Sequence, residues 1–266
     1  MHPMVFAPIP SITFDASDPA ATVAIGRLFA YLAMGVAAVV LLYYATIYVR
    51  DVLAVEAHTE QWYLLIGIGA AIVYAVAGIA SLLLEPDWIR RFVDGAILFF
   101  ILFLALAIRA MYHDQPTGGD RSRLLPVWAD YVVIVGFVAA WWGTFLVETS
   151  STRLVVAVGW VVTSAWAVLY GVRAVRVHEG TTFAALTRHL LPAIVCVAAI
   201  VFVDLVTSYA TGYGALADAT WLVGTSLVAA FLFNTAVAIR QQGGELERLY
   251  DWTTWREQSF DDGSLE

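Results

Sequence analysis

Seven long apolar stretches limit the fold of this chain more than any other feature of its sequence. An α-helix needs about 20 apolar residues to cross the hydrocarbon core of a bilayer. Of the 266 residues, 61% are hydrophobic and 14% are charged, whereas soluble domains carry about 25% charged residues. We therefore predict an all-α integral membrane protein, a bundle of seven transmembrane helices over residues 22–49, 62–84, 88–112, 124–147, 154–173, 186–209 and 217–239.

The arginines predict how this bundle is oriented, because short loops rich in Lys and Arg stay cytoplasmic. With the N-terminus outside, four arginines fall on the outer side: Arg27, Arg90, Arg91 and Arg153. The other ten fall on the inner side: Arg50, Arg109, Arg121, Arg123, Arg173, Arg176, Arg188, Arg240, Arg248 and Arg256. We therefore expect a multi-pass protein of the cell (plasma) membrane with its N-terminus outside and its C-terminus in the cytoplasm.

This orientation divides the chain into three parts. Residues 1–21 form a short extracellular tail, residues 22–240 the seven-helix membrane domain, and residues 241–266 an acidic cytoplasmic tail. The first 21 residues contain no Lys or Arg, which a secretory signal would carry, so we interpret them as part of the mature chain.

Lysine is absent, and all 14 basic residues are arginine in a chain of net charge −8. An acidic surface without lysine is typical of proteins from extreme halophiles, and a GC-rich genome would also favour arginine. There is no basic patch with interleaved aromatic residues, which argues against a nucleic-acid partner. The single cysteine, Cys196, excludes an intramolecular disulfide.

Charged residues inside spanning helices are costly, so each is a candidate for function. By helix position, Arg27, Arg91, Asp94 and Asp204 should lie at one depth in the outer half of the bundle. One interpretation is a structural ion-pair cluster that holds the helices together. The other is an ion or proton site, or the polar end of a ligand cavity, with Asp94 as its leading carboxylate.

A second polar group should lie near the cytoplasmic ends of the helices. It consists of Arg109, Asp130 and His189, and helix ends that reach the membrane interface explain it adequately. Asn234, near the middle of the last helix, should form a hydrogen bond with a neighbouring helix. We expect no metal site.

Several aromatic residues fall in the middle of the membrane. They could line a cavity for a flat apolar ligand, or they could simply be core. These residues are Trp142, Trp160, Trp166, Tyr170 and Phe231.

The third predicted helix begins Trp88-Ile-Arg-Arg-Phe-Val-Asp94, and with seven helices and an outside N-terminus this pattern resembles the microbial (archaeal-type, bacteriorhodopsin-like) rhodopsins. The resemblance implies that Arg91 matches the gating arginine of that family and Asp94 its retinal counterion. The fifth helix is similar in its early aromatic residue and in Tyr170. The likeness covers the topology of all seven helices, and its motif lies on the third.

The chain departs from that family at the residues that bind retinal. The family's retinal lysine would fall near Phe231 and its second counterion near Leu227, and neither position carries the required residue. The sixth helix has the apolar run Val195–Val201 in place of the family's aromatic pattern, and the connection at residues 85–87 is short. Because a Schiff base needs a side-chain amine, we expect a lysine-less homologue that binds no retinal covalently. A non-covalent retinal or carotenoid remains open.

Four functions compete at this point. The first is a non-photochemical sensor, partner subunit or binder of an apolar ligand, working in the lipid bilayer as a homo-oligomer or with a separate membrane transducer. The second is an ion or proton channel, or a small transporter, that uses Arg91, Asp94 and Asp204. A membrane enzyme of isoprenoid or carotenoid metabolism is less favoured, because the paired carboxylates of that chemistry are missing. A haem cytochrome needs two facing histidines, and His189 is the single one within a predicted span. We therefore expect a protein that is not an enzyme.

Overall fold

The computed structural model describes residues 19–53, 58–84, 87–114, 128–146, 150–177, 182–209 and 213–261. All of its regular structure in these ranges is helical, as predicted. The helices are α1 (Pro19–Leu53), α2 (His58–Leu83), α3 (Asp87–Asp114), α4 (Trp128–Leu146), α5 (Ser150–Val177), α6 (Thr182–Tyr209) and α7 (Gly214–Asp261). Residues 1–18 of the expected tail, and Arg121 and Arg123 of the expected inner side, lie outside the described residues.

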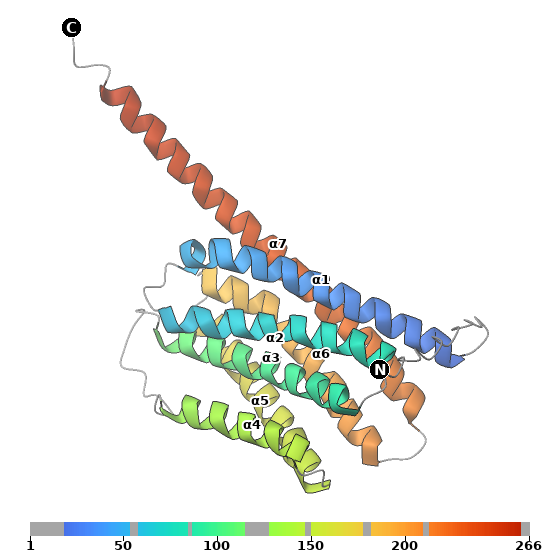
Figure 1. Cartoon of the computed structure of the whole chain (residues 1–266). Helices are drawn as coiled ribbons and strands as arrows, with labels where there is room; N and C mark the ends of the chain where they lie inside the picture. Colours follow the sequence, from blue (N-terminus) through green and yellow to red (C-terminus); the bar gives the residue numbers. More distant parts are fainter. Residues whose placement is uncertain are drawn as a thin grey trace, which may run out of the picture.

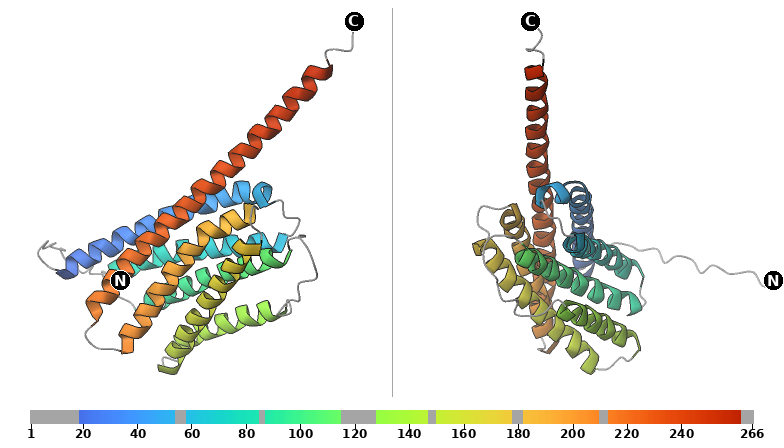
Figure 2. Two further views of the ribbon diagram at one scale, coloured as in Figure 1. Left: turned by 180° about the vertical axis from the view of Figure 1, so that it is seen from behind. Right: turned by 90° about the vertical axis from the view of Figure 1, so that its left-hand side faces the viewer.

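The helices form a bundle in which successive helices run in opposite directions (Figure 1). Helix α1 packs between α2 and α7, and the chain of neighbours continues from α2 through α3 and α5 to α6 and back to α7. Helix α4 lies at the periphery, against α3 and α5 (Figure 2). Helix α3 is the most deeply buried of the spanning helices, and its residues Leu98, Phe100 and Ile101 are 0% exposed.

Within the described residues, six helices are long and apolar enough to cross a membrane: α1, α2, α3, α5, α6 and the first part of α7. Helix α4 contributes a shorter apolar segment, Tyr131–Gly143. The outward faces are as apolar as the interior, with Phe29 66% exposed and Leu146 81% exposed. Exposing so much apolar surface to water is unfavourable, whereas lipid chains solvate it. The chain is therefore a multi-pass membrane protein.

Two glycines let helices approach closely. A Cβ atom on Gly78 of α2 would lie 2.1 Å from the ring of Tyr31 on α1, and one on Gly95 of α3 would lie 2.1 Å from Nε1 of Trp141 on α4. Small residues of this kind allow tight packing in membranes, where the hydrophobic effect does not drive helices together. Each glycine allows an aromatic side chain of a neighbouring helix to pack close to the polar residues described below.

Helix α7 is the longest element, with 48 residues, or about 72 Å at 1.5 Å per residue. Its membrane-crossing part is Gly214–Gln241. The rest continues as one helix away from the bundle (Figures 1 and 2). The position where the sequence suggested a change from membrane domain to tail is therefore inside a helix.

Candidate functional site: a polar layer at one end of the bundle

Arg27 on α1 holds the centre of a polar layer at the end of the bundle where α1, α3 and α7 begin. Its Nη2 atom lies 2.5 Å from a carboxylate oxygen of Asp218 on α7, and both side chains are 38% exposed. The guanidinium also lies 5.5 Å from the ring centroid of Trp221 on α7. Arg27 interacts electrostatically with Asp204 on α6 as well. One arginine thus connects α1, α6 and α7.

Two buried tyrosines form the floor of this layer. The rings of Tyr31 on α1 and Tyr74 on α2 meet edge to face with centroids 5.4 Å apart, and Tyr31 meets Trp221 at 4.8 Å. The Tyr74 side chain also interacts with those of Trp221 and Thr225 on α7. Tyr31, Tyr74 and Thr225 are 6%, 2% and 1% exposed. The floor is therefore closed by aromatic packing.

The carboxylate of Asp94 on α3 also belongs to this network, because it interacts electrostatically with Tyr31. Asp94 and Asp204 are both exposed, whereas the floor beneath them is buried. Three of the four residues predicted from the sequence, Arg27, Asp94 and Asp204, therefore belong to one connected layer. We define the polar layer by eight residues: Arg27, Tyr31, Tyr74, Asp94, Asp204, Asp218, Trp221 and Thr225.

Arg91, the fourth predicted residue, is turned toward α4. Its guanidinium lies 5.9 Å from the ring centroid of Phe145, and its backbone carbonyl accepts a hydrogen bond of 3.1 Å from Nε1 of Trp141. The Trp141 ring rests on Gly95 and also packs against Phe92 at 5.3 Å. Arg91 of the third-helix motif thus contacts α4, and Asp94 of the same motif interacts with Tyr31 of the polar layer.

The polar layer is formed by five helices, α1, α2, α3, α6 and α7. Below the layer, the buried side chains of these helices are mainly apolar. Thr225 and Asn234 on α7 mark its two limits, about 14 Å apart along the helix axis. The buried residues between these depths include Met34, Ala38, Leu41, Ile68, Leu98, Ile101, Val197, Val228 and Leu232. An ion can cross an apolar region only where polar groups or water surround it. On these five helices the layer thus borders apolar side chains toward the interior, whereas the middle of α5 carries the buried polar residues Thr163 and Ser164.

The opposite end of the bundle has its own polar contacts. Asn234 Nδ2 on α7 lies 3.1 Å from His189 Nδ1 on α6, which confirms the predicted hydrogen bond between Asn234 and a neighbouring helix. Arg109 is 3% exposed, and its guanidinium lies 5.4 Å from the ring centroid of Trp166 on α5. The side chain of Asp130, the third member of the predicted inner group, lies outside the described residues.

The aromatic residues proposed as cavity lining are distributed over the bundle. Trp142 is 55% exposed on the outer face of α4, and Phe231 is half-buried against the core. Trp166 and Tyr170 pack together near Arg109, with centroids 6.0 Å apart. Trp160 is buried at 9% exposure, and its Nε1 has no hydrogen-bond partner among the described residues. The structure does not bring these five side chains together around one space.

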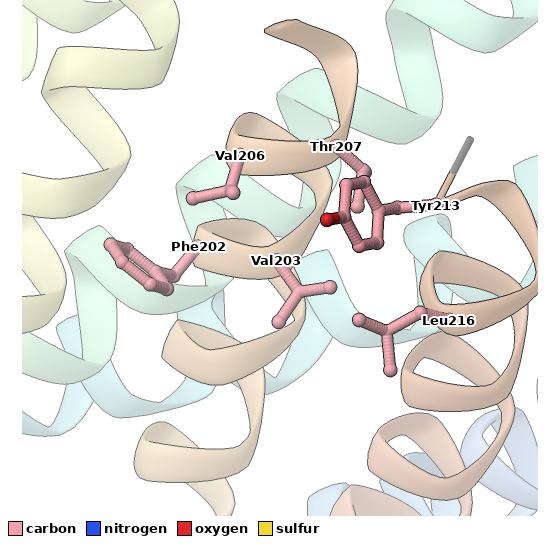
Figure 3. Close-up of a pocket in the computed structure, with 6 residues that line it drawn as sticks. All are labelled: Phe202, Val203, Val206, Thr207, Tyr213 and Leu216. Atoms are coloured by element: carbon pink, nitrogen blue, oxygen red, sulfur yellow. The ribbon is translucent and has the colours of Figure 1, made fainter. Parts of the chain in front are cut away.

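An open apolar slot of about 160 Å³ lies between α6 and the start of α7 (Figure 3). Its size is below the roughly 300–1,000 Å³ of pockets that enclose drug-sized ligands. None of the proposed aromatic residues lines it. The lining residues are Phe202, Val203, Val206, Thr207, Tyr213 and Leu216.

In the part of the chain that the structure describes, no three His, Cys, Asp or Glu residues are grouped so that they could hold a metal ion. Cys196 is a free, half-buried thiol.

The residues singled out from the sequence do not include five members of the polar layer: Tyr31, Tyr74, Asp218, Trp221 and Thr225. A helical spacing could have found several of them. Tyr31 follows Arg27 by four residues, and Asp218, Trp221 and Thr225 follow one another at spacings of three and four, so each set shares a helix face. Tyr74 has no such charged neighbour on its own helix.

In comparisons with known proteins, no protein-family model, no curated protein and no solved structure matches the chain. The resemblance to microbial rhodopsins therefore rests on the residues of this chain alone.

Proposed function

We propose that this chain is a non-photochemical membrane sensor or partner subunit that responds to ionic conditions at its polar layer. In this proposal it is a rhodopsin-like bundle of seven spans, with α4 as the seventh, in the plasma membrane. Its N-terminus is outside, so the polar layer faces the exterior and α7 leaves the bundle on the cytoplasmic side. The observation that carries the proposal is the polar layer itself, an exposed set of charges on a buried aromatic floor.

The apolar middle of the bundle favours a sensor over the competing channel or small transporter. On α7 the residues below the layer offer an ion no polar side chain, because Val228 and Leu232 are apolar and are 1% and 0% exposed. A closed site that ends above this region can bind an ion without passing it on. Helix α7 carries Asp218, Trp221 and Thr225 of the layer and is continuous to Asp261, so a tilt of α7 would be transmitted about 30 Å beyond Gln241.

Retinal has no covalent role in this proposal, because the chain has no lysine. Purified protein mixed with all-trans retinal should give no visible-absorbing adduct that survives denaturation. The absorption spectrum of protein isolated from its native membrane is the complementary measurement. A carotenoid band there would identify a non-covalent pigment, and a haem band would contradict the proposal.

Cysteine labelling tests the proposed topology in a Cys196→Ser background. A membrane-impermeant maleimide should label Ala20→Cys and Leu146→Cys on intact cells, and Trp128→Cys and Gln241→Cys only after permeabilisation. Labelling of Trp128→Cys and Leu146→Cys from the same side would exclude α4 as a spanning helix. The reversed pattern at Ala20→Cys and Gln241→Cys would overturn the orientation.

The sensor function is tested in proteoliposomes with spin labels on Val177→Cys of α5 and Gln241→Cys of α7. Changing pH, or exchanging Na⁺ for choline, on the side of the polar layer should alter the distance between the labels. A dye enclosed in the vesicles should detect no sustained proton or Na⁺ flux. Flux without a distance change would favour the channel, and the absence of both responses would contradict an ion-responsive sensor.

A further inference from the structure

Arg27 interacts with two carboxylates that belong to different helices. It pairs with Asp218 on α7 through Nη2, and it interacts electrostatically with Asp204 on α6. The Asp204 backbone carbonyl accepts a hydrogen bond of 3.1 Å from the Thr207 hydroxyl, whereas its carboxylate has no hydrogen bond or ion pair among the described residues. The two carboxylates thus compete for one guanidinium.

The ion pair with Asp218 does not use all the hydrogen-bond donors of Arg27. The contact involves one guanidinium nitrogen, and the Nε atom is buried without a hydrogen-bond partner among the described residues. A two-pronged arginine–carboxylate pair would satisfy two nitrogens, so this arrangement is not the strongest that the side chain can form. With 38% of its side chain exposed, Arg27 also has room to move.

Asp204 is placed to respond to the medium. It lies within the membrane-crossing segment Leu186–Thr207, close to its end, where a carboxylate without a partner is costly. It is also exposed, so a proton or a small monovalent cation can reach it. Arg27 on α1 is the charged group shown to interact with it. The other charged and titratable groups of the polar layer are Tyr31 on α1, Tyr74 on α2, Asp94 on α3 and Asp218 on α7.

We infer that Arg27 is a two-position latch: it pairs with Asp218 while Asp204 holds a proton or a small monovalent cation, and it moves to Asp204 when that cation leaves. This inference rests on the proposed sensor function and names its regulating group. Moving Arg27 removes the ion pair between α1 and α7 and replaces it with one between α1 and α6. Helix α7 is then free to tilt, which supplies the motion that the sensor function needs.

Trp221 reports the position of Arg27, because the guanidinium lies 5.5 Å from its ring centroid in the paired state. The full-length protein is labelled with 5-fluorotryptophan and placed in nanodiscs, and the Trp221 resonance is assigned by its loss in Trp221→Phe. A pH titration without Na⁺, and a Na⁺ titration at fixed pH, should each be followed by ¹⁹F NMR. A shift in the first series alone identifies a proton, and a shift in the second identifies Na⁺ or a similar cation.

The variants separate the latch from other causes of a shift. Asp204→Asn should keep the Trp221 resonance at the chemical shift of the cation-bound state in all conditions. Asp218→Asn should keep it at the chemical shift of the cation-free state, in which Arg27 pairs with Asp204. Asp94→Asn, the control in the same layer, should keep the response with a displaced midpoint. A full response in Asp204→Asn would overturn the latch, as would identical spectra of the Asp204→Asn and Asp218→Asn variants.

Failure of the latch and failure of the sensor function give different results. If the distance between labels at positions 177 and 241 responds equally in the wild type and in Asp204→Asn, the latch is wrong and the sensor function stands. If that distance never responds in the wild type, the sensor function fails, whatever the Trp221 resonance does.

Discussion

Gly78 on α2 lies against the ring of Tyr31 on α1 so closely that a Cβ atom would come within 2.1 Å of a ring carbon. Tyr31 in turn meets Tyr74 and Trp221 in the floor of the polar layer. The absence of a side chain at one position of α2 therefore determines how a tyrosine of α1 reaches the centre of the candidate site.

Gly78→Ala should destabilise the bundle and disturb the site. The added methyl group cannot fit unless Tyr31 or the α1–α2 interface moves, and overpacking of this kind costs about 1–3 kcal/mol. Thermal unfolding in detergent measures the loss. Gly69→Ala on the same helix is the control, because nothing lies within 4 Å of its Cβ position, and it should be neutral or stabilising by up to about 1 kcal/mol. Equal effects of the two substitutions would contradict the close contact.

The hydrogen bond between Asn234 and His189 should contribute modestly to stability. Interhelical hydrogen bonds in membrane proteins average about 0.6 kcal/mol and reach about 1.7 kcal/mol. A double-mutant cycle with Asn234→Leu and His189→Leu should give a coupling energy in this range. Thr235→Val is a matched control, since the Thr235 hydroxyl donates to the carbonyl of Phe231 on its own helix and should show no coupling to His189. A coupling near zero for Asn234 would exclude the bond.

Trp141 should anchor α4 to the segment of α3 that carries Arg91. Trp141→Phe keeps an aromatic ring but loses the 3.1 Å bond to the Arg91 carbonyl, at an expected cost of about 1 kcal/mol. Trp142→Phe changes a side chain that is 55% exposed and should stay within about 0.5 kcal/mol. Equilibrium unfolding of both variants measures the difference. A larger loss in Trp142→Phe would mean that α4 packs with its other face.

Arg109 and Arg240 provide matched cation–π contacts that differ in burial. Arg109 is 3% exposed with its guanidinium 5.4 Å from the Trp166 centroid, whereas Arg240 is exposed and lies 5.9 Å from that of Tyr44. Because desolvation strengthens such contacts, Arg109→Lys should cost about 2 kcal/mol and Arg240→Lys less than about 1 kcal/mol. Thermal unfolding of the two variants tests this order. An equal loss of stability would contradict the claim that burial strengthens the contact of Arg109.

The sequence by itself predicts the all-helical architecture, because long apolar runs and the bilayer's demand for internal backbone hydrogen bonding leave few alternatives. It also predicts the depth of charged residues, since 1.5 Å per residue converts position into depth. Arg27, Asp94 and Asp204 accordingly fall into one layer. Asn234 is a similar case: a lone amide in an apolar helix needs a partner on another helix.

Only the tertiary structure decides which face of each helix meets which neighbour. Arg27 pairs with Asp218 on α7, and Arg91 turns to α4, because rotation and crossing of the helices are set by contacts such as Gly78 with Tyr31 and Gly95 with Trp141. In an apolar solvent the helix faces differ little in hydrophobicity, so the sequence pattern carries little information about rotation. Tyr74 joins the layer from a helix without charges nearby, and only packing brings it there.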